Sequence, residues 1–311
     1  MIIDENPYLD PADSTCMPVD TLLRARYLIA DFSWKTLMGY EGFHIDDVTL
    51  RDAQMSLVLW EHPVKGTTTN NLTRIFRLDN IPQKEKTDKE IFRIERVQIE
   101  DFSFRMKNYS DNKTTYYGGG INWNDLEVND ININVSGLRF KGGIMSGSVN
   151  EMSFTEKSGY ICESMTGKAR VGNGLTHITD FRLIDPWSDL AIPEGKLIYT
   201  GIPDFSDYIH KVVMDAEIGN STVDMTSISY FAPQLEGNRL RIKASQGHYH
   251  GTVDDFTVED LSVAMEDGGF RGTISGRMTG IPDVMNTTIK GNLKNCMVTT
   301  KGLSRFVSYW M

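Results

Sequence analysis

A recurring pattern of apolar and polar positions runs through most of the chain. Apolar residues alternate with other residues, the alternation slips by one position at a polar–Asp step, and it then resumes. Alternation predicts a strand with one buried face. Because a one-residue slip would turn the rest of the strand onto the wrong face, we expect a bulge or sharp bend at each polar–Asp step. The aspartates of these steps are Asp52, Asp101, Asp130, Asp180 and Asp260.

The alternation predicts a long series of bent, half-buried antiparallel strands, separated by the Gly, Asn and Asp residues that hairpin turns require. The predicted strands are 44–50, 55–61, 92–99, 102–107, 124–135, 147–154, 176–183, 196–200, 239–244, 247–253, 257–264, 269–278 and 287–293. Apolar residues at helical spacing predict short helices at 72–76, 205–213, 227–235 and 303–310. The mixed-charge segment 82–89 is predicted to be a loop tip. The predicted fold class is all-β, mainly antiparallel, with a few short helices.

The pentapeptide Thr-Gly-Ile-Pro-Asp occurs twice, at 200–204 and at 279–283. A five-residue identity within one chain indicates that the chain is built from repeats. The composition changes near residues 199–204, where the first copy lies. We therefore predict a loose N-terminal lead-in over 1–18, a first β-rich repeat region over 19–199, and a second over 200–311 with a short terminal helix.

Charge and cysteine content restrict the classes of function. The 311-residue chain has a formal net charge of −10, which argues against a nucleic-acid groove and against docking on an anionic membrane surface. Its three cysteines, Cys16, Cys162 and Cys296, are isolated in sequence. They form no CxxC zinc or redox motif, although one disulfide bond remains open. No stretch approaches the roughly 20 apolar residues of a membrane-spanning helix, and the acidic segment 1–18 is not a signal peptide. We expect an export segment outside this chain rather than a cytosolic protein.

Candidate chemistry is sparse. His248 and His250 would share one face of a predicted strand, a spacing that suits a metal ion. Asp254 is the only third ligand suggested by sequence proximity, so two exposed strand histidines are favoured and no metal site or cofactor is predicted. The segment 167–174 is rich in glycine but lacks the ending of a phosphate loop, and a hairpin turn is favoured there. The sequence contains neither a Gly-x-Ser-x-Gly nor a His-Glu-x-x-His motif, and we predict that the protein is not an enzyme.

Asp185 and Asp189 flank an aromatic residue in the sequence Asp-Pro-Trp-Ser-Asp. Two carboxylates beside an aromatic ring are compatible with a glycosidase acid pair. A turn with an aromatic plug at the end of a strand is the favoured alternative.

Several short segments resemble a known family, the TamB and AsmA-like periplasmic proteins of the Bacteroidetes. The Glu-Lys-Ser-Gly and Tyr-Phe-Ala-Pro pieces are the most telling, and the pattern covers residues 44–311. The segments that carry the resemblance are 136–140 (SGLRF), 153–160 (SFTEKSGY), 185–189 (DPWSD), 230–235 (YFAPQL) and 303–306 (LSRF).

The resemblance implies an internal piece of a longer periplasmic protein that a helix outside this chain anchors in the inner membrane. It implies an elongated β-sheet, curled into a U shape around an apolar groove. It also implies a role in outer-membrane biogenesis, through assembly of outer-membrane proteins or movement of phospholipid between the two membranes. The implied partners are a phospholipid or other amphipathic lipid, outer-membrane assembly proteins, and neighbouring segments of the full-length chain, with no nucleic acid.

An apolar groove agrees with strands that carry one apolar face, because that face must be covered. We expect the groove to be lined by the apolar residues that flank the polar–Asp steps. These are Ile99, Phe102, Phe104, Val128, Ile131, Ile133, Phe181, Leu183, Val258, Leu261 and Val263. The same residues would also serve as the closed core of a sandwich. The alternative function is therefore a structural or adhesive β-protein that binds protein or glycan at its surface.

Overall fold

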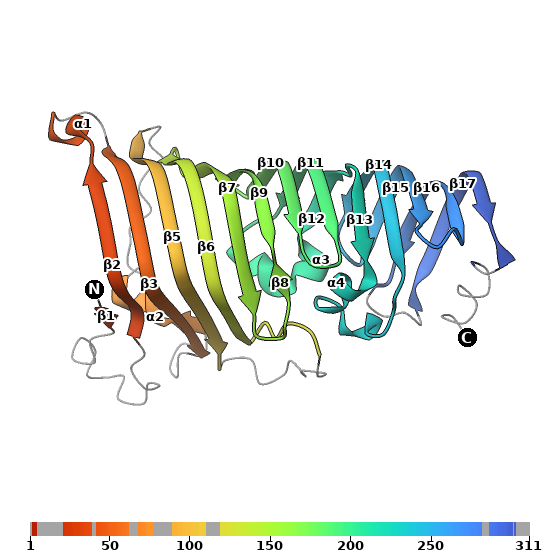
Figure 1. Cartoon of the computed structure of the whole chain (residues 1–311), viewed down its shortest axis with the longest axis horizontal. Helices are drawn as coiled ribbons and strands as arrows, with labels where there is room; N and C mark the ends of the chain where they lie inside the picture. Colours follow the sequence, from red (N-terminus) through yellow and green to blue (C-terminus); the bar gives the residue numbers. More distant parts are fainter. Residues whose placement is uncertain are drawn as a thin grey trace. The chain divides into compact units, whose positions relative to one another are not determined.

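The computed structural model describes residues 2–4, 21–38, 42–61, 68–76, 89–109, 119–281, 286–300 and 302. Strands dominate these residues, and the helices among them are short (Figure 1). The strands form one large, mixed but mostly antiparallel sheet. The predicted all-β class is therefore confirmed, whereas the U shape, the apolar groove and the repeats stay predictions.

The chain divides into two compact units. Unit 1 comprises residues 1–142, 150–162 and 230–233, and unit 2 comprises 143–149, 163–229 and 234–311. The repeat regions expected at 19–199 and 200–311 are not tested by this division and stay predictions.

Unit 1 is built on long strands joined mostly by antiparallel ladders. One ladder is parallel: β3 runs beside β5 from the pair Phe43–Phe92 to the pair Leu59–Asn108. Figure 1 shows β2, β3, β5 and β6 in succession. The elements are β1 (Ile2–Asp4), β2 (Thr21–Phe32), α1 (Trp34–Leu37), β3 (Phe43–Glu61), β4 (Thr68–Asn70), α2 (Asn71–Phe76), β5 (Glu90–Asn108), β6 (Asp125–Lys141), the second half of β7 (Ile144–Glu156) and β8 (Ile161–Cys162).

Unit 2 takes in the first half of β7 and the remaining strands, and the ladders described between its strands are antiparallel. Its elements are β9 (Ser164–Gly172), β10 (Leu175–Ile184), β11 (Asp189–Ile198), η3 (Ile202–Asp207), α3 (Tyr208–Lys211), β12 (Val213–Glu217), β13 (Ser221–Asp224), α4 (Met225–Ser229), η4 (Pro233–Leu235), β14 (Arg241–Gly251), β15 (Asp255–Met265), β16 (Phe270–Thr279) and β17 (Thr288–Val298).

The bulge or sharp bend expected at each polar–Asp step is confirmed by the backbone conformation of the aspartates. Asp52, Asp101, Asp130, Asp180 and Asp260 all have φ between 45° and 54°, in the left-handed region. Aspartate tolerates this region better than most residues because its short polar side chain bonds locally. The ladder register shifts at four of these steps, between Ile99 and Phe102, Val128 and Ile131, Thr179 and Arg182, and Val258 and Leu261. The same conformation occurs at Asn295 on β17, where an asparagine stands in the place that aspartate has in the other steps.

The bulges explain why several predicted strands are halves of one longer strand. Segments 44–50 and 55–61 join into β3 across Asp52, and segments 92–99 and 102–107 join into β5 across Asp101. In β14, the predicted strands 239–244 and 247–253 join across a register shift near Gln246. The slip in alternation therefore marks a bend within a strand rather than its end.

The helix predictions have mixed outcomes. The expected helices at 72–76, 205–213 and 227–235 correspond to α2, to η3 with α3, and to α4 with η4. The terminal helix at 303–310 and the loop 82–88 lie outside the described residues. The lead-in expected over 1–18 contains a short strand, β1, which pairs with β2. Segment 167–174 forms the β9–β10 hairpin, with Asn173 and Gly174 at positive φ in its turn, so the turn interpretation is correct.

Candidate functional site

In unit 1, the predicted groove residues lie opposite one another across the β5–β6 ladder. Ile99 pairs with Ile133, Phe102 with Ile131, and Phe104 with Val128. Directly opposed residues project from the same face of a sheet. The left-handed residues Asp101 and Asp130 therefore keep three apolar pairs on one face of two bent strands.

In unit 2, the predicted groove residues also meet apolar residues or glycine across the ladders. Phe181 pairs with Ile192 and Leu183 with Leu190. Leu261 pairs with Ile274, while Val258 and Val263 pair with glycines on β16. The apolar face of β10 thus extends onto β11, and that of β15 extends onto β16.

Glycine allows close approach where bulged strands carry large residues. A Cβ built on Gly247 of β14 would lie 2.7 Å from Leu261, and one built on Gly167 of β9 would lie 3.2 Å from the Cα of Phe181. Both glycines have φ near 150°, which other residues rarely adopt. A side chain at either position would displace the strand next to a bulge.

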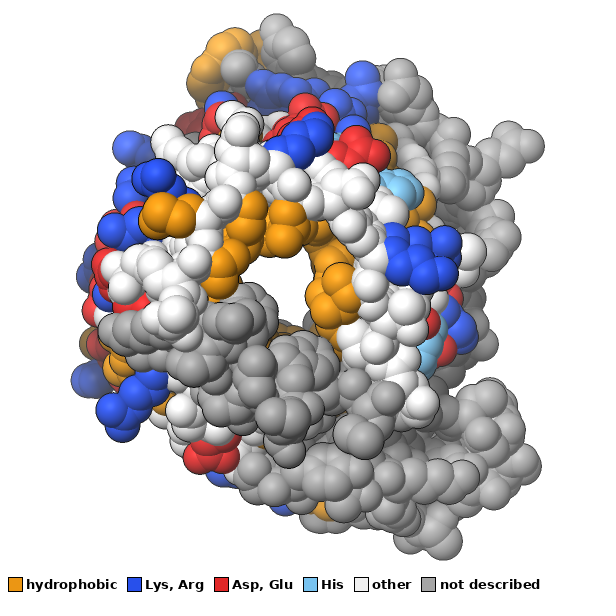
Figure 2. All heavy atoms as spheres, turned by 90° about the vertical axis from the view of Figure 1, so that its right-hand side faces the viewer, with side chains coloured by type: hydrophobic (Ala, Val, Ile, Leu, Met, Phe, Trp, Pro, Cys, Tyr) orange, Lys and Arg blue, Asp and Glu red, His pale blue; other side chains and the backbone are white. Residues whose placement is uncertain are grey.

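The predicted groove residues are only partly covered. Ile131 is 5% exposed, and the other ten are half-buried, neither sealed in a core nor fully open. Only eleven hydrophobic side chains are buried in the part of the chain that the structure describes. Figure 2 looks onto the β17 end of unit 2 and shows hydrophobic side chains around a hollow, with charged side chains on the outside.

Arg–Asp pairs lie on the outward face. Arg96 Nε donates to Asp47 across β3 and β5 at 2.6 Å, and Arg182 Nε donates to Asp189 across β10 and β11 at 2.8 Å. These hydrogen bonds hold the pKa of both carboxyl groups below the usual range of aspartate. Alternation therefore separates a charged face from the apolar one on the same strands.

The Asp-Pro-Trp-Ser-Asp segment forms a tight turn. The Asp185 carboxylate is buried and its Oδ1 accepts three hydrogen bonds, from the backbone N–H of Trp187, the backbone N–H of Ser188 and the hydroxyl of Ser227, each at 2.8 Å. Asp189 is engaged by Arg182. The carboxylates of Asp185 and Asp189 both accept hydrogen bonds from neighbouring residues of the fold. This favours the turn interpretation over a glycosidase acid pair.

A cavity of about 560 Å³ lies in unit 2 and is lined by residues of β11 and of β13 to β17. Most of the lining residues are of polar type, and they include Asp189, Lys243 and Arg271. Of the predicted groove residues only Val263 contributes to it.

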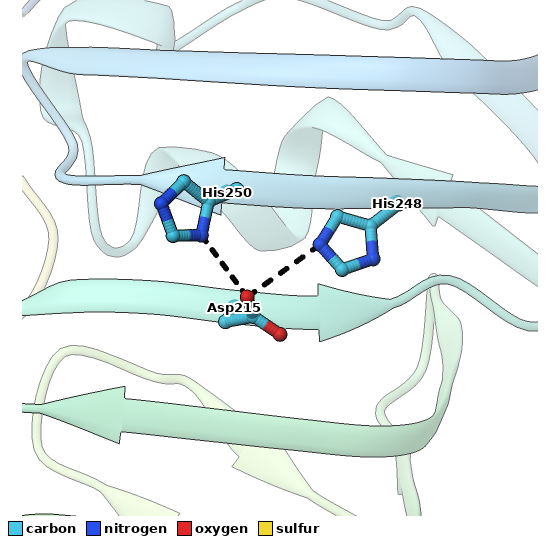
Figure 3. Close-up of side chains that lie close together, drawn as sticks. All are labelled: Asp215, His248 and His250. Carbon is cyan, nitrogen blue, oxygen red and sulfur yellow. Dashed lines mark hydrogen bonds and ion pairs between the residues drawn. The ribbon is translucent and has the colours of Figure 1, made fainter.

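The two histidines of the His-x-His pair do meet a carboxylate, but not the expected one. Asp254 accepts a hydrogen bond from the Thr252 hydroxyl at 2.6 Å in the turn after β14. Asp215 of β12 instead lies between the two rings (Figure 3), with its Oδ2 3.0 Å from His250 Nδ1 and 3.6 Å from His248 Nε2. Sequence reasoning missed Asp215 because it precedes His250 by 35 positions and meets it only through the β12–β14 ladder.

Cys162 and Cys296 are thiols in the structure, and Cys16 lies outside the described residues. Among the helices that the structure describes, none is long and apolar enough to cross a membrane. No family model, curated protein or solved structure matches the chain. The resemblance to TamB and AsmA-like proteins therefore stays a prediction, and the function must be argued from the geometry.

Proposed function

We propose that this chain is a non-enzymatic scaffold that shields lipid acyl chains along the apolar face of its bulged strands. The observation that carries the proposal is the partial burial of the groove residues, ten of which are half-buried although their cross-strand partners are apolar residues or glycine. An apolar face that the chain does not itself seal calls for an apolar occupant.

Acyl chains fit such a face energetically. Each CH₂ group removed from water gains about 0.8 kcal/mol, so two lipid tails need no charged clamp to be held. The headgroups would remain in water beside the strand edges. Lipid handling is therefore compatible with an acidic chain of net charge −10.

The wider setting of the proposal comes from the family resemblance. On this proposal the chain would lie in the periplasm, as a segment of a longer protein that serves outer-membrane biogenesis. The occupant would be a phospholipid or another amphipathic lipid in transit between the membranes. Outer-membrane assembly proteins and neighbouring segments of the longer chain would be its protein partners.

Native mass spectrometry of protein purified without detergent tests the proposal. We expect bound phospholipid in the wild type and a marked loss of it in Phe104→Asp. Ser103→Asp is the matched control, because it introduces the same charge one position away on the opposite face of β5. Absence of lipid from the wild type, or equal loss in both variants, would contradict the proposal.

A second candidate function is surface binding of glycan or protein, favoured by one aromatic pair in unit 1. Trp123 is 56% exposed and Phe231 is 48% exposed, with ring centroids 6.4 Å apart. Exposed aromatic rings are typical binding surfaces. This function predicts that Trp123→Ala abolishes binding on a glycan array or in protein pull-down, while Phe104→Asp leaves that binding intact.

A further inference from the structure

Four chemically active side chains meet on the β12–β14 ladder of unit 2. Asp215 lies directly opposite His250, and Glu217 lies directly opposite His248. Residues two apart on a strand share a face, so all four side chains project from the same side. Two short strand segments thus bring together two imidazoles and two carboxylates.

The distances among these groups suit coordination. One ligand atom each from Asp215, His248 and His250 lies within 4.8 Å of the others. Tetrahedral Zn²⁺ with bonds of about 2.0–2.1 Å requires ligand atoms about 3.3 Å apart. The two measured separations to Asp215 Oδ2, 3.0 Å and 3.6 Å, lie on either side of that value.

We propose that Asp215, His248 and His250 bind one divalent transition-metal ion of the Zn²⁺ class. Imidazole and carboxylate ligands suit zinc, and copper or nickel compete for the same set. The three ligands leave a fourth position to water. Figure 3 shows both rings turned toward the carboxylate between them.

Glu217 lies where it can orient the His248 ring. Its Oε1 lies 3.0 Å from Nδ1 of His248, the nitrogen that does not face Asp215. A carboxylate hydrogen-bonded to the second ring nitrogen fixes the tautomer and the orientation of a metal-binding histidine. Glu217 therefore acts through His248 rather than as a ligand.

The surrounding charges are mixed. Glu259 lies opposite His248 on β15, and Lys196 lies opposite Asp215 on β11. Lys196 Nζ forms an ion pair with Glu194 Oε1 on the same strand, at 3.4 Å. An ion bound at this cluster would link β12, a strand of five residues, to the longer β14 through side-chain ligands.

Titration of chelator-treated protein, prepared without a histidine tag, tests the site with Zn²⁺ alone. Isothermal titration calorimetry should show one equivalent bound, and Zn²⁺ should raise the melting temperature. His248→Gln, His250→Gln and Asp215→Asn should each abolish this binding, and Glu217→Gln should weaken it about tenfold. Circular dichroism of the same variants shows whether the fold is retained, which is expected because the ligand side chains are not buried.

Two other imidazole–carboxylate pairs supply matched controls. His177 Nε2 lies 3.2 Å from Glu194 and His210 Nδ1 lies 2.6 Å from Asp207, and neither pair belongs to a cluster of three possible metal ligands among the described residues. His177→Gln and His210→Gln should leave Zn²⁺ binding unchanged. Lack of one-equivalent binding by the wild type, or binding that survives both His248→Gln and His250→Gln, would overturn the proposal.

Discussion

Phe102 on β5 lies directly opposite Ile131 on β6, and each residue directly follows a left-handed aspartate, Asp101 at φ 50° and Asp130 at φ 54°. The two bulges fall at the same level of adjacent strands. Each inserts one extra residue, so the apolar side chains return to the same face after the bend. The pairing of bulges is what keeps the apolar face continuous along strands of 19 and 17 residues.

The left-handed position at Asp101 predicts an unusual order of substitutions. Asp101→Val should lower the free energy of unfolding by about 1–2 kcal/mol, because a β-branched residue is strained in this region. Asp101→Gly should be close to neutral, because glycine adopts positive φ without cost. The measurement is the midpoint of urea unfolding.

Glu95 on the same strand serves as the comparison, because its φ is not in the left-handed region. There valine should be tolerated better than glycine, as in ordinary strands. If the valine and glycine variants had the same order of stability at positions 101 and 95, the left-handed conformation of Asp101 would not be the cause of the effect.

Much of the fold could be predicted from the sequence, because alternation and its slips are local properties. The slips at Asp52, Asp101, Asp130, Asp180 and Asp260 predict the five positions where the strand backbone turns left-handed. Partners could not be predicted in the same way. Nothing in the sequence of β3 or β5 indicates that they run parallel, since that depends on how the intervening chain returns.

The candidate sites differ in how much the sequence could reveal. The apolar face follows from alternation, so the sequence predicts its residues, and the ladders pair them with apolar or glycine partners. The metal cluster needs a ladder between β12 and β14, which no local pattern predicts. Alternation does not predict strand β2, because its residues from Tyr27 to Ile29 are an unbroken apolar run. All three of these side chains are exposed.

The turn at Asp185 predicts a measurable stability effect. Ser227→Ala removes one of three donors to a buried carboxylate, which should cost about 1.5–3 kcal/mol, as expected for hydrogen bonds to charged groups. Ser229→Ala is the control, because that hydroxyl donates only to the Thr226 carbonyl nearby on the chain. Urea denaturation should separate the two variants, and equal midpoints would contradict a structural role for Asp185.

The outward Arg–Asp pairs predict a dependence on acid pH. Arg96 holds the pKa of Asp47 below its usual value through a hydrogen bond. A lowered folded-state pKa means that the stabilisation is present above the unfolded pKa of about 3.9 and is lost as pH falls through the folded pKa. Asp47→Asn should therefore be less stable than the wild type at pH 6, and the difference should vanish at the acid end of a urea-midpoint series. A difference that stays constant across the series would show that the ion pair is not its source.

Strand β17 predicts self-association. It pairs with β16, and all eleven of its residues are exposed, including Ile289 at 58% and Leu293 at 57%. An exposed strand is a template for pairing with another chain. Analytical ultracentrifugation should detect dimers or larger species at high concentration, reduced in Leu293→Lys but not in Ile198→Lys, which changes an exposed apolar residue of β11. A wild type that stays monomeric at high concentration would exclude this prediction.

Site-specific photo-crosslinking tests the central claim, that lipid tails lie on the apolar face, most directly. A benzophenone side chain replaces Phe104 or Val258 on the apolar face. In the control proteins it replaces the neighbouring Ser103 or Thr257 on the opposite face. Each protein is irradiated after purification without detergent. The account predicts phospholipid adducts at Phe104 and Val258 and none at Ser103 and Thr257. Adducts of equal yield on both faces, or on neither, would contradict it.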